Sequence, residues 1–354
     1  MIDPQAPLAA QCCASPLEGG ARCDPAKPGR ARRGRAAQGG AALLVAMIVV
    51  ALVATLAAGA LWRQWRGVEV EAAERARLQA DWVLVGALDW GRLILRADGD
   101  TSNVDHLGEP WAVPLAEARL STFLAAGQAS QDVDRDAFLS GQITDLQSRL
   151  NLMNLACDDP QQRLFATQVF RRLFTVLGLP AGEVDLIQRG LLAARQAALG
   201  TATAPGNAPL LPQRLEQLAW LGVSPQTIVA LAPYATLLPD PGVTPVNINT
   251  ASAEAIYAAA PDLDLASARR LVALRQQSYF SDVPSALTAI DVSGVQQQWL
   301  DVKTNYFEIR GRLRLDAVAL EEVCVARRDN TPASHQVVPL WRYRTPLTLA
   351  PTGG

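Results

Sequence analysis

Side chains that could carry out catalysis are few in this sequence. The two histidines, His106 and His335, lie in polar, loop-like stretches, and there is no third histidine to complete a metal-binding pair. The sequence has no GxSxG nucleophile elbow, no P-loop, no HExxH zinc motif and no paired CxxC. We therefore predict that the protein is not an enzyme. The alternative is an extracytoplasmic hydrolase, and a catalytic carboxylate pair cannot be picked from the 34 acidic residues by sequence alone.

Nucleic-acid binding is the second kind of chemistry to consider. The stretch VNINTASAEAIYAAAPDLDLASARRLV, beginning at Val246, has the pattern of two short helices joined by a tight turn. Asn249 or Thr250 is expected to cap the first helix. DNA-binding hairpins of this kind use glycines in the turn so that backbone amides approach phosphate, but here the turn carries Asp262 and Asp264. Because two carboxylates repel phosphate, we predict a packing module that binds no nucleic acid.

Charge is distributed unevenly along the 354 residues. The chain is 49% hydrophobic and 19% charged, which is enough to build two or three cores. Residues 1–40 hold six basic and three acidic side chains. Taking these from the 32 basic and 34 acidic residues of the whole chain leaves 26 and 31, so the rest of the protein is acidic. An acidic body also argues against binding to phosphate backbones.

The segment from Ala41 to Trp62 contains no charged side chain. A helix of this length rises roughly 33 Å, enough to cross a bilayer. Arg32, Arg33 and Arg35 precede it. By the positive-inside rule they hold the N-terminal side in the cytoplasm, so the rest of the chain is predicted to lie across the membrane.

Three interpretations of this segment stay open. A cleaved secretory signal has an apolar region of about 7–15 residues before a small-residue site, such as LAAGA near Gly59. A plain signal anchor is the second interpretation. In the third, Gly39 and Gly40 end a basic leader directly before the apolar run, which is similar to the site cut by prepilin peptidase. Cleavage would then fall between Gly40 and Ala41 and make Ala41 the N-methylated amino terminus.

The helix is predicted to continue beyond the membrane. Residues 63–98 contain no proline, and Glu71 and Arg75 can pair one turn apart. Apolar residues recur at the spacing of one helical face. They are Leu78, Trp82, Val85, Leu88 and Ile94. The pattern indicates a continuous stem helix that is apolar at first and amphipathic afterwards.

Five sequence blocks, in this order, resemble the minor pseudopilin K of type II secretion systems, also called general secretion pathway protein K. They are GAALLVAMIVVALVATLAAGALWRQ (Gly40–Gln64), GEPWAVPL (Gly108–Leu115), GQITDLQSRLNLMNL (Gly141–Leu155), LLPDPGVTPVNINTASAEAIYA (Leu237–Ala258) and TNYFEIRGRLRL (Thr304–Leu315). Together they span almost the whole chain after residue 34.

The resemblance implies a single-pass protein of the inner membrane, processed by prepilin peptidase, with its body in the periplasm. Most pilin-like subunits carry a glutamate at the fifth position of the processed helix, whereas this chain has Val45, as K subunits do. Without that carboxylate the subunit cannot pair with the amino group of a subunit beyond it. Stem packing is expected through Val45, Val49 and Leu52, with Trp62 and Trp65 at the membrane edge.

The partners that the resemblance implies are those of a fibre tip. They are the minor pseudopilins I, J and H and the major pseudopilin G, and the assembly would help to export folded proteins. Secreted exoproteins or the outer-membrane secretin are further partners left open. The rival interpretations are a membrane-anchored periplasmic binding protein outside any fibre and a DNA-uptake protein that uses the helical hairpin. The true translation start also stays open.

The expected fold is α+β and pilin-like, with the stem helix packed on an antiparallel sheet. Short strands are expected in ARLSTFLAA and DAFLSGQITDLQSRL, with Asp145 and Gln147 at the end of the second. PQQRLFATQVFRRLFTVLGL, PAGEVDLIQRGLLAARQAAL and LPQRLEQLAWLG are expected to be helices, each opened by a proline. YFEIRGRLRL, VALEEVCVA and VPLWRYR return to strand-like alternation.

The sheet is therefore interrupted by a large all-α insertion, SAM-like or helix-hairpin-helix-like, whose hairpin module spans residues 246–290. The expected segments are a cleaved basic leader (1–40), the stem helix (41–98, with 41–62 in the membrane), the first part of the β domain (99–150), the helical insertion (151–302), the C-terminal strands (303–345) and a tail (346–354).

The cysteines divide between leader and body. Cys12, Cys13 and Cys23 fall in the leader, so Cys157 and Cys324 remain in a compartment that permits disulfides. Either a bond joins them, tying the insertion to the C-terminal strands, or both are isolated buried thiols. No cofactor is expected.

Calcium is left open, because some K subunits carry it in the helical domain. The candidate oxygen donors are Asp158, Asp159 and Glu183. Their spacing does not resemble an EF-hand, so the metal site stays unassigned.

Overall fold

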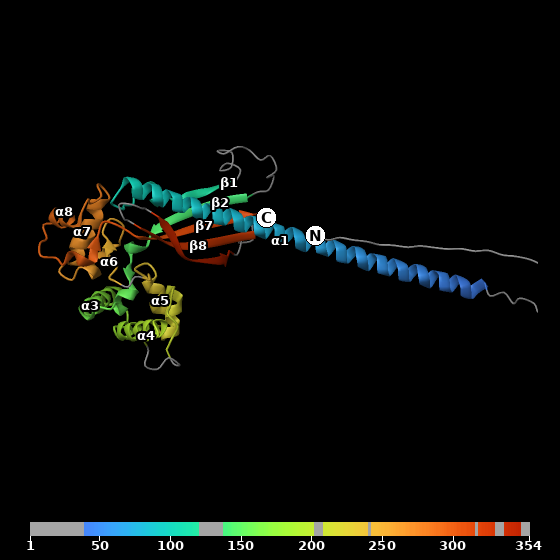
Figure 1. Cartoon of the computed structure of the whole chain (residues 1–354), viewed down its shortest axis with the longest axis horizontal. Coiled ribbons are helices and arrows are strands. Elements are labelled where there is room, and N and C mark those ends of the chain that lie inside the picture. The colour runs from blue at the N-terminus through green and yellow to red at the C-terminus, as the bar shows by residue number, and fades with distance from the viewer. Residues whose placement is uncertain are drawn as a thin grey trace, which may run out of the picture. The chain divides into compact units, whose positions relative to one another are not determined.

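The structure is a computed structural model that describes residues 39–119, 137–201, 208–239, 242–315, 318–329 and 336–347. Helix α1 (Gly39–Thr101) is continuous over 63 residues (Figure 1). It ends three residues beyond the expected end of the stem, and the predicted pair between Glu71 and Arg75 is present at 2.6 Å. The leader, residues 1–38, lies outside the described part of the chain.

The chain divides into two units, residues 1–69 and 70–354, and each is considered by itself. In the first unit the described residues are turns of α1, and every side chain from Ala41 to Glu69 is exposed. Among the described residues, α1 is the one helix long and apolar enough to cross a membrane. Its apolar stretch is exposed, whereas the core helix of a soluble protein would be buried.

The second unit contains a five-stranded antiparallel sheet in the order β1-β2-β7-β8-β9. The strands are β1 (Leu115–Arg119), β2 (Ala137–Asp145), β7 (Tyr306–Leu315), β8 (Val318–Arg328) and β9 (Val337–Pro346). The three C-terminal strands that the sequence predicts are confirmed. Most of the strand predicted from Ala118 falls outside the described residues, which include only its start at the end of β1.

The C-terminal half of α1 packs on this sheet through small and branched residues. The buried positions are Ala80, Leu84, Leu88, Gly91 and Leu95. They meet Leu139 and Leu313 at one end of the sheet and Phe307 and Ile309 at the other. Full burial of each leucine stabilises the fold by about 1.5–3 kcal/mol.

The predicted apolar face of α1 is only partly correct, since Leu88 and Ile94 pack on the core under the sheet. Leu88 is buried as expected, but Leu78 is 59% exposed and Trp82 75% exposed. The sheet packs on the face of α1 that carries Ala80 and Gly91, and at Gly91 the approach is so close that a β-carbon would meet Ile309.

Ion pairs fasten α1 to the edge strand β9. Asp81 accepts from Arg344 at 2.6 Å, and the Asp89 carboxylate lies 3.6 Å from Arg342. Arg92 donates to the carbonyl of Val337 at 2.7 Å. These contacts fix the rotation of α1 about its axis.

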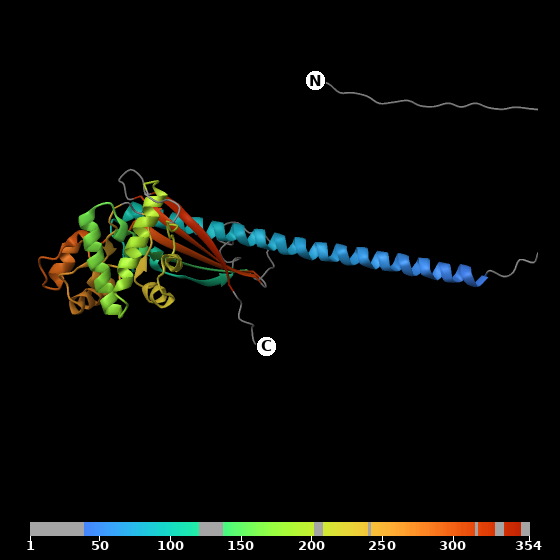
Figure 2. The same ribbon diagram turned by 90° about the horizontal axis from the view of Figure 1, so that it is seen from below.

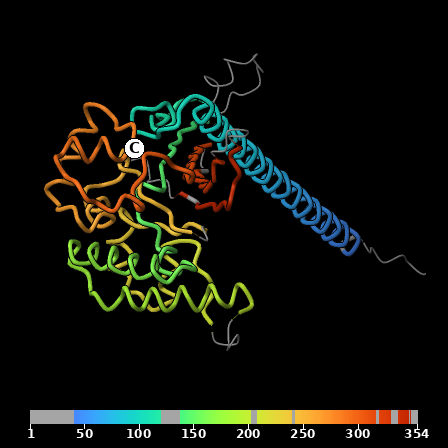
Figure 3. The backbone as a smooth tube through the Cα atoms, turned by 60° about the vertical axis from the view of Figure 1, so that its left-hand side comes forward, coloured from blue at the N-terminus to red at the C-terminus, as the bar shows by residue number. Residues whose placement is uncertain are grey.

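Between β2 and β7 the chain forms the helical insertion. Its longer helices are α3 (Pro160–Leu177), α4 (Gly182–Ala198) and α7 (Leu265–Arg275), and its shorter ones α5 (Pro225–Leu231), α6 (Ala253–Ala259) and α8 (Val283–Ala289). Figures 1 and 2 show α3–α8 gathered at the end of the sheet where α1 ends. In Figure 3 they form a green and yellow group with α3 and α4 and an orange group with α7 and α8.

Short elements complete the insertion. They are the 3₁₀ helices η2 (Leu146–Ser148), η3 (Leu152–Ala156), η5 (Leu215–Leu221) and η6 (Gln297–Trp299), and the parallel two-residue pairs β3 (Leu150–Asn151) with β4 (Ala235–Thr236) and β5 (Val246–Asn247) with β6 (Leu300–Asp301). The segment LPQRLEQLAWLG, predicted as an α-helix, is the 3₁₀ helix η5. A further 3₁₀ turn, η1 (Pro110–Ala112), follows the stem and buries Trp111.

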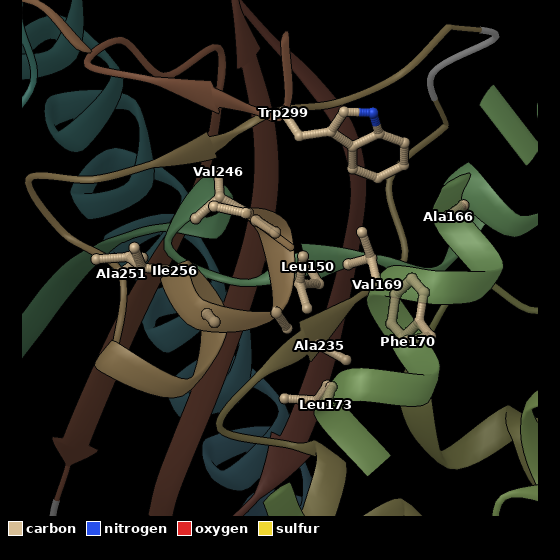
Figure 4. Packing of buried hydrophobic residues seen from close by; sticks show 14 of the residues in the cluster. Leu150, Ala166, Val169, Phe170, Leu173, Ala235, Val246, Ala251, Ile256 and Trp299 are labelled. Atoms are coloured by element: carbon tan, nitrogen blue, oxygen red, sulfur yellow. The ribbon is translucent and has the colours of Figure 1, made fainter. Parts of the chain in front are cut away.

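The insertion has a hydrophobic core of its own. Figure 4 shows Phe170 and Leu173 of α3 facing Leu150 and Val246, with Trp299 above them. This cluster is separate from those between α1 and the sheet. The pilin-like fold, with a helical insertion interrupting the sheet, is thus confirmed. We call the sheet with the C-terminal half of α1 one lobe and the helical insertion the other, and the two lobes have different hydrophobic cores.

Candidate functional site

The residues predicted to act in processing and membrane packing all lie on the first part of α1. Gly40 and Ala41 are in its first turns, since the helix begins at Gly39. The side chains expected to pack against other stems are exposed. They are Val45, Val49, Leu52, Trp62 and Trp65. No charged side chain interrupts this surface between Ala41 and Trp62, so it is suited to lipid or to another apolar helix.

A second apolar surface lies on the part of α1 that packs on the sheet, and it faces away from the sheet. Leu78, Trp82, Trp90 and Leu93 are all exposed there. With Gly86 they recur at steps of four or three residues, which places them on the side of the helix opposite Leu84 and Leu88. We call these five residues the outer stem stripe. An exposed row of apolar side chains that includes two tryptophans is typical of an interface.

An apolar groove runs beside the stripe, between α1 and the first two strands. Its volume is about 240 Å³. Trp90 and Ile94 line one side, and Trp111, Leu115 and Ile143 line the other. The groove is therefore a second apolar feature next to the exposed Trp90.

The most concentrated polar site is buried where the two lobes join. Asp145, at the end of β2, accepts hydrogen bonds from the amide of Gln147 (2.6 Å), the Nδ2 of Asn247 (3.0 Å) and the hydroxyls of Thr250 and Thr304. These donors come from the segment leaving the sheet, from the insertion and from the segment returning to β7. The Asp145 carboxylate thus holds both segments by which the chain passes between the sheet and the insertion, the one that leaves β2 and the one that returns to β7. We call this cluster the junction.

Arg328 of β8 is the cation of the junction and is 2% exposed. It donates to Asp98 at the end of α1 (2.8 Å) and to Asp105 in the loop after it. Asp105 also accepts from the backbone amide of Thr304 at 2.7 Å. Burial raises the pKa of Asp98, Asp105 and Asp145, that of Asp105 to about 7.

Three buried asparagines in the insertion use their side-chain amides to form a pair of hydrogen bonds with the backbone of another residue, one donated and one accepted, as neighbouring strands do. The side chain of Asn151 both donates to and accepts from Leu238, and Asn249 does the same with Phe280. Asn154 exchanges the same two bonds with Thr244 at 3.0 and 3.1 Å. These amides satisfy backbone groups of buried loops, which would otherwise be costly to leave unpaired.

This pairing corrects one sequence prediction. Neither Asn249 nor Thr250 caps α6, because Asn249 is bonded to Phe280 and Thr250 to Asp145. The cap is Ser252, whose side chain accepts from the amide of Ala255. The predicted caps, Asn249 and Thr250, therefore lie three and two residues before the actual cap, Ser252.

The helical hairpin presents acids at its turn, as predicted. Asp262 and Asp264 are exposed, and Asp264 caps α7 by accepting from Ser267 at 2.7 Å. That hydrogen bond lowers the pKa of Asp264. Arg172 of α3 holds the turn from inside, donating to the carbonyls of Tyr257, Pro261 and Leu263. The turn therefore presents two carboxylates outward, while its backbone carbonyls are held by Arg172 of α3.

The three acids considered for calcium have other partners or lie apart in the fold. Asp158 is bonded to Arg195 at 2.7 Å, Asp159 caps α3, and Glu183 lies in the first turn of α4. In the junction, Asp98, Asp105 and Glu109 bring carboxylate oxygens within 4.8 Å of one another. There the guanidinium of Arg328 pairs with Asp98 and Asp105, so a positive charge already faces two of these three carboxylates.

The disulfide alternative is contradicted by the structure. Cys157 and Cys324 are both free and buried. Cys157 follows η3 in the insertion, whereas Cys324 lies on β8 against Leu88 and Leu95 of α1. The two thiols belong to different lobes and are isolated, and burial raises the pKa of both.

His106 lies after the stem and stacks on Tyr279 with ring centroids 4.0 Å apart. Its Nδ1 accepts from the amide of Gly108. His335 is outside the described residues. Sequence reasoning missed Asp105, Thr304 and Arg328 as junction residues, because charge patterns give no sign of which acids the fold buries together.

Parts of the chain match known protein families. Two family models, each described as type II secretion system (T2SS), protein K, match residues 148–240 and 246–309. These segments include the three buried asparagines, Asn247 and Thr304. A comparison with curated protein sequences gave no match.

Among solved structures, the chain is similar to a chain in the crystal structure of the GspK-GspI-GspJ complex from the enterotoxigenic Escherichia coli type 2 secretion system. The TM-score is 0.58 at 20% identity, over 77% of this chain and 98% of that chain. This likeness supports the fold. The two family matches add that, over residues 148–240 and 246–309, the chain is similar to type II secretion system protein K.

Proposed function

We propose that this protein is a tip subunit of a type II secretion pseudopilus. There it would assemble with the minor pseudopilins I and J, then H, above the major pseudopilin G, and help to export folded proteins across the outer membrane. The observation that carries the proposal is the outer stem stripe, an exposed apolar surface on the same helix whose other side is packed on the sheet.

The stripe suits the stems of other pilin-like subunits. Trp82 and Trp90 are of the residue type that most often dominates binding energy at interfaces. Gly86 lies between them and leaves open space around its α-carbon, so a neighbouring helix can approach closely there. The groove beside Trp90 offers a pocket for an apolar side chain of the same partner.

Membrane anchoring is the second part of the proposal. Prepilin peptidase would cleave between Gly40 and Ala41 and methylate Ala41. The apolar part of α1 would then hold the protein in the inner membrane with its body in the periplasm. Val45 provides no carboxylate for the amino terminus of a subunit beyond it, which suits the last position of a fibre.

The helical insertion supports a capping role. It lies at the end of the sheet where α1 ends, and both of its connections pass through the junction (Figure 1). A rigidly held lobe at that end would obstruct the docking of another subunit above it. The proposed mechanism is assembly and mechanical contact.

The mature amino terminus tests the processing step. We expect intact-mass analysis of protein from a host with prepilin peptidase to give a chain that begins at methylated Ala41. A chain that begins beyond Trp62, or one that retains Met1, would contradict it. A host that lacks the peptidase provides the control.

Assembly is tested by co-purification. The full-length protein, expressed with its cognate I and J subunits and solubilised in detergent, is expected to purify as a complex with both. Replacement of Trp82 and Trp90 by Ser should reduce the recovered I and J, whereas replacement of Trp220, exposed in the insertion, should not. A chain that purifies alone in all cases would favour the rival, a periplasmic binding protein outside any fibre.

A further inference from the structure

The junction buries more negative than positive charge. Asp98 and Asp105 share one guanidinium, that of Arg328, and Glu109 lies beside them, while Asp145 is buried nearby without a cation among the hydrogen-bond partners that the structure describes. Asp105 and Asp145 are each 1% exposed, and Asp98 is paired directly with Arg328. Burial of several carboxylates around one cation is unfavourable unless one of them takes up a proton.

The surroundings of Asp145 distinguish it from the other acids. Asp98 and Asp105 both accept from Arg328, which favours their charged forms. In contrast, the hydrogen-bond partners of Asp145 in the described structure are neutral groups. Burial raises the pKa of both Asp105 and Asp145, so the pair holds a proton more readily than an exposed carboxylate does.

The hydrogen-bond partners of Asp105 and Asp145 also indicate which of the two carboxylates holds the proton. Asp105 is held by an amide and a guanidinium, which can only donate, so a proton on the bonded oxygens of Asp105 would face another donor. Asp145 is held in part by the hydroxyls of Thr250 and Thr304. A hydroxyl can turn and accept, so a protonated Asp145 keeps its partners by donating to one of them.

The other charged groups near the junction do not provide a counter-ion for Asp145. Arg275 of α7 donates to the carbonyls of Ile248 and Ala251. Asp301 accepts from the amides of Val302 and Lys303. On the far side, His106 stacks on Tyr279, and its Nε2 lies 3.9 Å from Glu109.

We propose that Asp145 holds a proton in the folded protein at neutral pH and that loss of this proton loosens the insertion from the sheet. Both chain crossings depend on this carboxyl group, through the amide of Gln147 and the hydroxyl of Thr304. When it ionises without a cation partner, opening the junction to water becomes favourable, while the separate cores keep each lobe folded. The junction would then act as a hinge between the two lobes that stays closed while Asp145 is protonated.

Infrared spectroscopy tests where the proton lies, because the carbonyl stretch of a protonated carboxylic acid is separate from that of a carboxylate. The full-length protein in detergent should show a protonated-acid band at neutral pH that is lost as the pH is raised. The band should be missing in Asp145→Asn and retained in Asp264→Asn, which alters an exposed cap. Absence of the band in the wild-type protein at neutral pH, or its loss in Asp105→Asn but not in Asp145→Asn, would overturn the assignment.

Hydrogen exchange in the wild-type protein tests the hinge without a variant that might misfold. After correction for intrinsic rates, exchange of the Gln147 and Thr304 amides should accelerate by about tenfold per pH unit until Asp145 is ionised in the closed state. Amides of α3 and β7 should show no such change. Equal acceleration in both lobes would indicate global unfolding and reject the hinge, as would no acceleration at either crossing.

Discussion

Gly91 of α1 faces Ile309 of β7 so closely that a β-carbon at Gly91 would stand 2.8 Å from the Ile309 Cγ2. The contact lies midway along the buried face, between Leu88 and Leu95. A glycine at this point lets helix and sheet approach, so the position is set by packing and not by backbone conformation.

The first prediction compares the same substitution at two glycines of α1. Gly91→Ala should be about 1–3 kcal/mol less stable than Gly86→Ala, because only the first forces Ile309 to move. Gly86 has open space around it, so alanine there should be neutral or stabilising by up to about 1 kcal/mol. Thermal unfolding followed by circular dichroism measures both. Equal stability of the two variants would show that the helix can shift on the sheet.

The second prediction concerns the outer stem stripe. Trp82→Ala should change the free energy of unfolding by less than about 0.5 kcal/mol, since the side chain is largely exposed. If Trp82 is a binding hot spot, the same change should weaken association with a partner subunit by at least about 2 kcal/mol, roughly thirtyfold in Kd. Calorimetric unfolding and a titration with labelled partner separate the two effects. A large loss of stability with unchanged binding would place Trp82 in the fold and not in the interface.

The third prediction is the pH dependence of unfolding. Burial raises the pKa of Asp105 to about 7 and also raises that of Asp145, both above the ordinary value of 3.8. The pair therefore keeps one proton in the folded state, on Asp145, at pH values where the unfolded chain has lost it. The stability that comes from this pair is present at low pH and lost as pH rises toward and through 7.

Between pH 5.5 and 8 we expect a loss of about 2 kcal/mol in the free energy of unfolding. The exposed caps Asp264 and Asp282 have lowered pKa values, so they stay ionised throughout this range and do not contribute. Urea unfolding at several pH values measures the slope, and the double variant Asp105→Asn, Asp145→Asn should remove most of it. A wild-type protein that is more stable at pH 8 would contradict the sign.

The fourth prediction concerns the thiols. Cys157 and Cys324 should both be recovered as free thiols and should react with iodoacetamide only when the protein unfolds, because both are buried with raised pKa values. Peptide mapping by mass spectrometry, with and without denaturant, reports each cysteine separately. A Cys157–Cys324 linked peptide, or rapid labelling of the native protein, would count against the buried free thiols.

Local sequence patterns were enough to predict most of the helices and strands and their order along the chain. The charge-free run from Ala41 to Trp62 and the proline-free stretch after it predict α1, since helix length and apolarity are local properties. Alternation after Tyr306 predicts β7, β8 and β9, and prolines open the segments predicted for α3 and α4. Asp145 and Gln147 were noticed only as the end of a strand.

The tertiary structure decided which face of α1 is buried, which acids meet and whether the cysteines join. The tryptophans of α1 are as apolar as its leucines, so hydrophobicity alone could not exclude Trp82 from the core. Only the fit of Gly91 against Ile309 does so. Asp105, Asp145 and Arg328 are separated by 40 to more than 200 positions in the sequence, and no local rule brings them together. Their contact follows from the return of the chain to β7, where Thr304 bonds both acids.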